Sequence, residues 1–168
     1  MLHKNELMTR LEDTETTSEP STSSVETTPK VKQRENSLKN IEDLDWSKYT
    51  ILIAEDENHN FLYLESLLEL TKVNIIRAVN GKQCVEIVRK NKDIDIILMD
   101  VQMPVMNGIE ATRTIKSFRK DITIIAQTAF ALKENKENCE AVGTDDFLTK
   151  PVRSRILIDT ILKHLVKK

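Results

Sequence analysis

From Thr50 onward, the sequence alternates between short apolar runs and longer stretches in which apolar residues recur every three or four positions. The apolar runs are rich in Ile, Leu and Val and contain few polar residues, which is typical of strands buried on both faces. We therefore predict five strands, over residues 50–55, 73–79, 94–100, 122–128 and, more weakly, 145–150.

The stretches between these runs have the period of amphipathic helices. In residues 59–72, for example, Phe61, Leu64 and Leu68 fall on one face. Similar patterns predict helices over 81–92, 107–120 and 153–168, and a highly charged one near 133–142 that is either mobile or an ordinary edge helix. Strand alternating with helix predicts an α/β domain in which helices cover both faces of a parallel sheet.

The first 43 residues have a different composition. Ten of the fifteen residues in 14–28 are Ser or Thr, and Val25 is the only apolar side chain among them. Such a stretch cannot bury enough apolar surface to offset its ordering entropy. We predict a disordered Ser/Thr/Glu-rich tail or linker over 1–43 and a folded domain over 44–168. A solvated spacer is favoured over a phosphorylation target.

Composition excludes several classes of protein. The net charge of −2 and the pI near 6.0 give no basic face for a nucleic acid. No apolar run approaches the ~20 residues of a membrane span, and the N-terminus lacks the apolar core of a secretory signal. Cys84 and Cys139 form no metal-binding pattern and are interpreted as free thiols. These features predict a cytoplasmic protein with no membrane and no nucleic-acid partner.

Polar residues stand at the carboxyl end of four predicted strands, where ligands bind in doubly wound sheets. They are Glu55-Asp56-Glu57, Asp100, Gln127-Thr128 and Lys150-Pro151. Because these ends converge, we expect three acids, a hydroxyl and an ammonium in one shallow cleft.

The chemistry of this set favours phosphoryl transfer. Clustered carboxylates repel one another unless cations lie among them; Lys150 supplies one positive charge, and Mg²⁺, which prefers oxygen ligands, would supply the rest. Asp100 can then act as a nucleophile toward phosphorus, with Lys150 and the Thr128 hydroxyl on the phosphoryl oxygens. Each residue alone also fits a cap, a loop or a strand position, but their joint placement favours a site.

The sequence resembles the receiver domain of two-component response regulators over residues 49–165. The motifs that carry the resemblance are ILIAEDE, MDVQMPVMNG, QTA and GTDDFLTKP, and their wording is closest to receivers attached to hybrid histidine kinases. The resemblance implies a flavodoxin-like three-layer sandwich: a five-stranded parallel sheet of order 2-1-3-4-5 with five helices. It further implies a signalling module that is not an enzyme, although it assists its own phosphorylation and dephosphorylation.

The resemblance also implies a role for each motif residue. Asp100 would accept a phosphoryl group from a histidine kinase or histidine phosphotransfer protein, while Thr128 and Lys150 contact its oxygens. Ligands of Mg²⁺ would be Asp56, Asp100 and the backbone carbonyl of Gln102, with Glu55 acting through water. The peptide bond before Pro151 would be cis. Phe147 would be the aromatic residue that turns from outside to inside on phosphorylation, and Phe130 would crowd the water that hydrolyses the phosphoryl group.

Output would pass through the surface of the fourth helix, the fifth strand and the last helix, which docks a downstream protein or forms a weak dimer. The chain is interpreted either as a stand-alone receiver or as the C-terminal segment of a hybrid kinase. Other classes fit less well. Aspartyl phosphatases need a second acid where Gln102 stands, and nucleotide-binding folds need clustered glycines, whereas Gly81, Gly108 and Gly143 are scattered. A receiver-like binding module without phosphorylation would usually lack one of the acids or the lysine.

Overall fold

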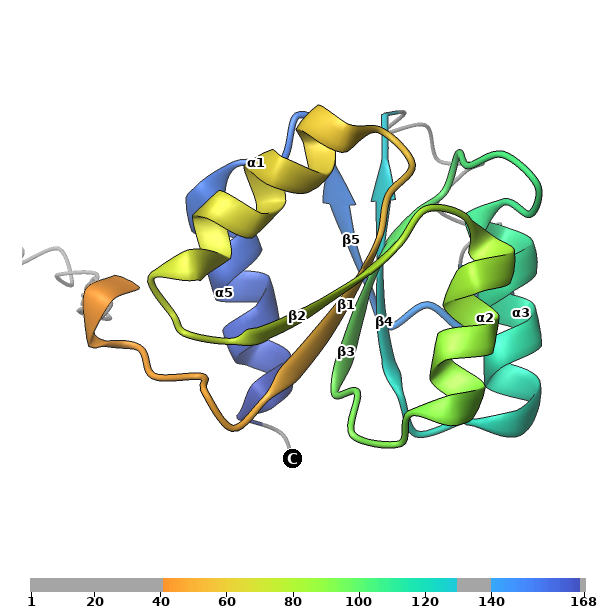
Figure 1. Ribbon diagram of the computed structural model, residues 1–168, viewed down its shortest axis with the longest axis horizontal. Helices are drawn as coiled ribbons and strands as arrows, with labels where there is room; N and C mark the ends of the chain where they lie inside the picture. The colour runs from red at the N-terminus through yellow and green to blue at the C-terminus, as the bar shows by residue number, and fades with distance from the viewer. Residues whose placement is uncertain (1–40, 130–139, 167–168) are drawn as a thin grey trace, which may run out of the picture. The chain divides into compact units, whose positions relative to one another are not determined.

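The computed structural model describes residues 41–129 and 140–166, and in them the predicted apolar runs form one parallel sheet (Figure 1). Its hydrogen-bonded order is β2-β1-β3-β4-β5. The strands are β1 (Thr50–Ala54), β2 (Asn74–Ala78), β3 (Ile96–Asp100), β4 (Thr123–Thr128) and β5 (Asp146–Thr149). The predicted α/β class and strand order are therefore confirmed.

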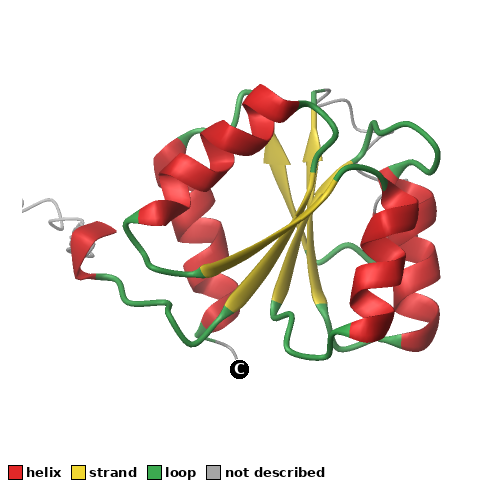
Figure 2. Ribbon diagram, viewed as in Figure 1, coloured by secondary structure: helices red, strands yellow, loops and turns green. Residues whose placement is uncertain are grey.

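Helices cover both faces of this sheet, as Figures 1 and 2 show. The helices α1 (Asn58–Glu69) and α5 (Ser154–Leu165) lie on one face, and α2 (Gly81–Lys90) and α3 (Gly108–Phe118) lie on the other. The predicted helix over 133–142 falls mostly outside the described residues; of it, residues 140–142 are described and are helical. The three-layer, flavodoxin-like architecture is thus confirmed.

Side-chain caps fix where two of the helices begin. The Asn80 side chain accepts a hydrogen bond from the Gln83 N–H at 2.8 Å and starts α2. Asn107 and Glu110 form a reciprocal capping box at the start of α3. Most helices end a few residues before the predicted limits. After α3, the guanidinium of Arg119 binds the backbone carbonyl groups of residues 91, 92 and 94, which turns the chain toward β4.

The sheet divides the core into two apolar clusters. Alternate residues of β1 point to opposite faces: Ile51 and Ile53 pack under α1 and α5, whereas Leu52 and Ala54 pack under α2 and α3. All four are fully buried, which confirms the two-sided burial expected from the sequence. Cys84 belongs to the second cluster as a free thiol, and its burial raises its pKa to about 12.

The segment before β1 packs against the domain. Trp46 is 4% exposed, and its backbone N–H donates to the Thr71 carbonyl at 2.7 Å. Ile41–Asp43 form a short 3-10 helix, η1, and Ile41 packs partly against the first cluster. The sequence assigned residues 41–43 to the tail; the rest of the predicted tail lies outside the described residues. Among the described helices, none has the length and apolar character needed to cross a bilayer.

Gly108 allows α3 to begin directly against the end of β3. A Cβ atom at this position would lie 2.1 Å from the Asp100 carbonyl oxygen and 3.0 Å from the Met99 side chain. The Gly108 N–H also donates to the Val101 carbonyl at 3.0 Å. The close approach of this backbone fixes the loop that follows Asp100.

We therefore expect Gly108→Ala to lower the free energy of unfolding by about 1–3 kcal/mol, the usual cost of overpacking. Urea unfolding followed by circular dichroism measures this. Lys82→Ala, at an exposed position of α2, is the control and should change stability by less than about 0.5 kcal/mol. Equal stability of Gly108→Ala and wild type would contradict the packing constraint.

Candidate functional site

The residues predicted for the site come together at the carboxyl edge of the sheet, the edge that the arrowheads mark in Figure 2. Asp100 is the last residue of β3, Glu55 follows β1 and Lys150 follows β5. The Lys150 Nζ donates to Glu55 Oε2 at 2.8 Å and to Asp100 Oδ2 at 2.6 Å. We call these three residues the acid–lysine cluster. One ammonium thus joins two carboxylates from two other strands.

The side chains of the acid–lysine cluster are largely buried. The side chains of Glu55, Asp100 and Lys150 are 0%, 7% and 21% exposed, respectively. The second oxygen of each acid is also bound: Glu55 Oε1 accepts from Asn60 Nδ2 at 3.1 Å, and Asp100 Oδ1 accepts from the Gln102 N–H at 3.0 Å. Both carboxylates are therefore held in fixed orientations.

Burial and hydrogen bonding compete in setting the protonation of this cluster. Desolvation raises the pKa of Asp100, and the hydrogen bonds from Lys150 and Gln102 only partly offset it. For Lys150, desolvation lowers the pKa, but hydrogen bonds to Asp100 and Glu55 outweigh it and leave the pKa raised. Lys150 is therefore cationic at neutral pH.

The acids together make a group that can hold a metal ion. Glu55, Asp56 and Asp100 each offer a carboxylate oxygen, and these oxygens lie within 4.8 Å of one another. When ionised, they carry more negative charge than Lys150 neutralises. An all-oxygen donor set suits Mg²⁺ and does not suit zinc, which favours His and Cys. The residues present thus fit a magnesium site.

The structure also places the other predicted residues. The Lys150–Pro151 peptide bond is cis, as the resemblance implies. Thr128 ends β4, and its backbone carbonyl accepts from the Lys150 N–H at 2.8 Å. Phe147 is half-buried in β5. The metal contact predicted for the Gln102 carbonyl and the side-chain roles of Thr128 and Phe147 stay predictions, and Phe130 lies outside the described residues.

Two residues near the site were not predicted from the sequence. Asn60, in the first turn of α1, orients Glu55. Arg77, on β2, donates to the Asp56 carbonyl at 3.4 Å and to Asn58 Oδ1 at 2.8 Å, and lies over the Phe61 ring. Arg77 thereby ties β2 to the loop that carries Asp56. Arg77 comes close to the acids because β2 pairs with β1. No short sequence motif indicates this pairing.

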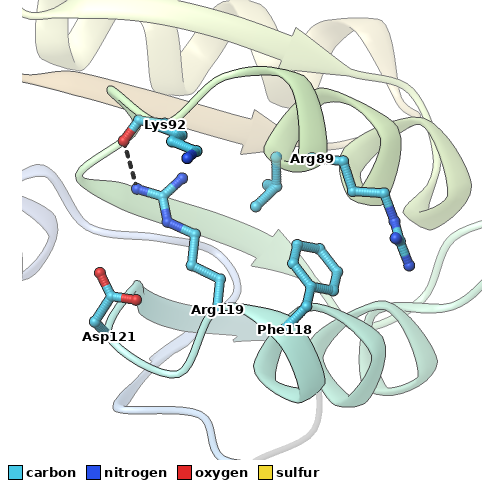
Figure 3. A pocket seen from close by; sticks show the side chains of 6 residues that line it. Arg89, Lys92, Phe118, Arg119 and Asp121 are labelled. Carbon is cyan, nitrogen blue, oxygen red and sulfur yellow. Dashed lines mark hydrogen bonds between the residues drawn. The ribbon is translucent and has the colours of Figure 1, made fainter.

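A groove of about 510 Å³ lies elsewhere, between the C-terminal ends of α2 and α3 (Figure 3). Arg119 lines the groove, but its guanidinium already donates hydrogen bonds to backbone carbonyl groups. The Arg89 guanidinium carbon lies 4.4 Å from the centre of the Phe118 ring. In a parallel sheet, these helix ends adjoin the amino ends of the strands. The groove is therefore separate from the acid–lysine cluster and holds none of its acids.

Comparison with known proteins identifies relatives. The family profile of the response regulator receiver domain matches residues 51–162. The chain is 38% identical over 125 residues to hybrid signal transduction histidine kinase I of Dictyostelium discoideum, a match covering 70% of this chain but only 7% of that kinase. It is 32% identical over 118 residues to the polar-differentiation response regulator DivK of Brucella anthropi, covering 69% of this chain and 95% of that protein.

Solved structures give the same picture. The receiver domain of Ssk1, in its complex with the Saccharomyces cerevisiae histidine phosphotransfer protein Ypd1, is similar with a TM-score of 0.67 and 32% identity, covering 70% of this chain and 88% of the other. The Vibrio cholerae chemotaxis protein CheY4 is similar with a TM-score of 0.65 and 25% identity, covering 69% and 98%, respectively.

The raised pKa of Asp100 predicts that Asp100→Asn increases the free energy of unfolding at pH 7 without Mg²⁺. Below the pKa of the unfolded state, near 3.8, Asp100 is protonated in both the folded and the unfolded protein. As pH rises through the higher pKa of the folded state, ionisation of the buried carboxyl group lowers the free energy of unfolding. The advantage of Asp100→Asn should therefore shrink toward pH 4. Urea unfolding with a chelator present measures it, and exposed Asp93→Asn is the control. A constant or reversed difference would contradict the burial argument.

The predicted binding of Mg²⁺ can be tested separately from the raised pKa of Asp100. Mg²⁺ should stabilise the wild type, by about 2.7 kcal/mol at a hundredfold excess over Kd, whereas Asp56→Asn should lose most of this gain. Thermal unfolding with and without Mg²⁺ tests it. Glu57→Gln, next along the same loop and outside the group of acids, should keep the stabilisation. Equal responses of Asp56→Asn and Glu57→Gln would exclude Asp56 as a ligand.

Proposed function

The chain belongs to the response regulator receiver family, and from this membership and the surroundings of Asp100 we propose that it accepts a phosphoryl group on that residue. The observation that carries the proposal is the double contact of Lys150 with Asp100 and Glu55, at 2.6 and 2.8 Å. This ammonium would lie beside a phosphoryl group formed on Asp100.

In the transfer step, one carboxylate oxygen of Asp100 attacks phosphorus, while the bond from phosphorus to a histidine nitrogen of the donor breaks. Its electron pair stays with the departing imidazole. The Gln102 N–H, which binds Asp100 Oδ1, would hold the carboxylate in its attacking orientation. Lys150 would move from the carboxylate to a phosphoryl oxygen, and the Thr128 hydroxyl would bind another. Such positioning is the main work a protein does in phosphoryl transfer.

Mg²⁺ would neutralise charge that one lysine cannot. Asp56, Asp100 and the Gln102 carbonyl are the proposed direct ligands, with Glu55 acting through water. The phosphoryl oxygens and the acids would otherwise repel one another in a poorly hydrated site.

The phosphorylated state would be read by another protein. We infer that Thr128 moves toward the phosphoryl group and that Phe147 changes its burial, so that β5, α5 and the predicted fourth helix present a different surface. This is a shift between two populated states, biased by the new charge. The downstream partner that docks on this surface, and a weak dimer through it, stay predictions.

The proposed donors are a histidine kinase or a histidine phosphotransfer protein. The similarity to the Ssk1 receiver, solved with a phosphotransfer protein, supports this class of partner. The identity with a hybrid kinase favours a segment of a larger protein, whereas the coverage of DivK favours a stand-alone receiver. In either setting the module is not an enzyme acting on a separate substrate, and we place it in the cytoplasm, where kinase and Mg²⁺ meet.

A receiver-like module that binds a partner without phosphorylation is the alternative. Nothing in the described site favours it, because the two buried acids, the third acid and the lysine are all present and close together.

Labelling with acetyl phosphate tests the proposal. With Mg²⁺ present, the wild type should gain the mass of one phosphoryl group in an acid-stable, base-labile linkage, and Asp100→Asn should gain none because its amide is not a nucleophile. Asp93→Asn, exposed and distant from the cluster, should label like the wild type. An unlabelled wild type would overturn the proposed function; equal labelling of Asp100→Asn would overturn the assigned nucleophile.

A further inference from the structure

Gln127, near the end of β4, has a fully buried side chain that no role assigned so far explains. Both its amide oxygen and its amide nitrogen lack a hydrogen-bond partner among the residues that the structure describes. Buried polar groups in proteins are almost always hydrogen-bonded, to the protein or to ordered water. The amide of Gln127 therefore indicates either a water-binding site or a polar ligand.

Gln127 lies in the same row of the sheet as the two acids of the acid–lysine cluster. Asp100 pairs directly with Gln127, and Glu55 follows Ala54, which pairs with the residue before Asp100. Paired residues of neighbouring strands point to the same face. These three side chains therefore continue, on three adjacent strands, the face that is covered by α1 and α5.

The side chain of Lys150 also crosses the strand that carries Gln127. Lys150 follows β5, whereas its partner Asp100 ends β3, and β4 lies between these two strands. Adjacent strands are about 4.8 Å apart, so the lysine side chain has to extend across the end of β4 to reach Asp100. The strand it crosses is the one that carries Gln127.

A small cavity joins these groups. It has a volume of about 80 Å³ and is lined by Gln127, Glu55, Lys150, Asn60 and Tyr63, among others. The Tyr63 hydroxyl donates to the Val152 carbonyl at 2.8 Å, which links α1 to the segment after β5 along this cavity. A water molecule takes about 30 Å³ in the liquid and needs two to four polar partners. The cavity offers this room and these partners.

On the basis of the proposed function, we propose that Gln127 is a positioning residue for the phosphorylation of Asp100. Its amide binds ordered water in the cavity, and this water binds the cavity side of Glu55 and Lys150. During transfer, Lys150 has to release Asp100 and take up a phosphoryl oxygen. The water network keeps the ammonium above β4 during this exchange and prevents it from turning into solvent. An apolar side chain at position 127 would fill similar space but give the water no partner.

Two substitutions separate positioning from packing. Gln127→Leu removes the amide at similar size, so the variant should be about as stable as the wild type, because burial of the apolar side chain offsets the lost hydrogen bonds to water. Gln127→Asn keeps an amide but leaves space, so it should be less stable. Acetyl phosphate labelling at saturating Mg²⁺ should follow a different order: wild type fastest, Gln127→Asn slower, and Gln127→Leu slowest, about tenfold below wild type, the effect of one hydrogen bond.

Thr112→Val is the matched control, because Thr112 is another buried polar residue but lies on α3, on the other face of the sheet. It should label at the wild-type rate. Labelling rates that follow the stability order, or a wild-type rate in Gln127→Leu, would overturn the role of Gln127 and leave the proposed function intact. An unlabelled wild type would instead overturn the proposed function, and the role of Gln127 with it.

Discussion

The ion pair of one ammonium with two buried carboxylates is the constraint on which the rest of the site depends. Lys150 binds Glu55 and Asp100 although the three residues stand at the ends of three different strands. This contact forms only if β1, β3 and β5 end at the same level, and if the loop after β5 directs its lysine back over the sheet. The strand order and the strand lengths are therefore also conditions of the chemistry.

The same ion pair leaves a charge imbalance that would favour a bound cation. Two ionised carboxylates taken out of water are costly, and one ammonium compensates only part of the cost. Asp56, at the rim, adds further negative charge within 4.8 Å. A divalent ion would relieve this repulsion. Since a phosphoryl group on Asp100 would add further negative charge, the lysine and a metal ion would be needed after transfer as well as before it.

The fold and the central residues of the site follow from the sequence because both depend on short-range patterns. Apolar runs gave the strands, and parallel strands bring Glu55, Asp100 and Lys150 to one edge. The roles of Asn60 and Arg77 could not be predicted, since they depend on how α1 and β2 pack against that edge. From the sequence, Gln127 could be assigned only to the end of a strand. The full burial of its side chain and the lack of a hydrogen-bond partner for its amide among the described residues are known only from the structure. Residues 41–43 were assigned to the tail because the boundary was placed at the change in composition, whereas Ile41 packs partly against the first cluster.

The register in which β1, β3 and β4 pair determines both the core and the site. On the face under α1 and α5, Ile53, Leu98 and Ile125 are fully buried, and two positions further along their strands stand Glu55, Asp100 and Gln127. A shift of one residue in any of these strands would turn its apolar side chains to the opposite face. It would also remove its polar residue from the row. The free energy of burying the two apolar clusters thus keeps the polar row aligned, so that the precision of the site is supplied by residues that take no part in its chemistry.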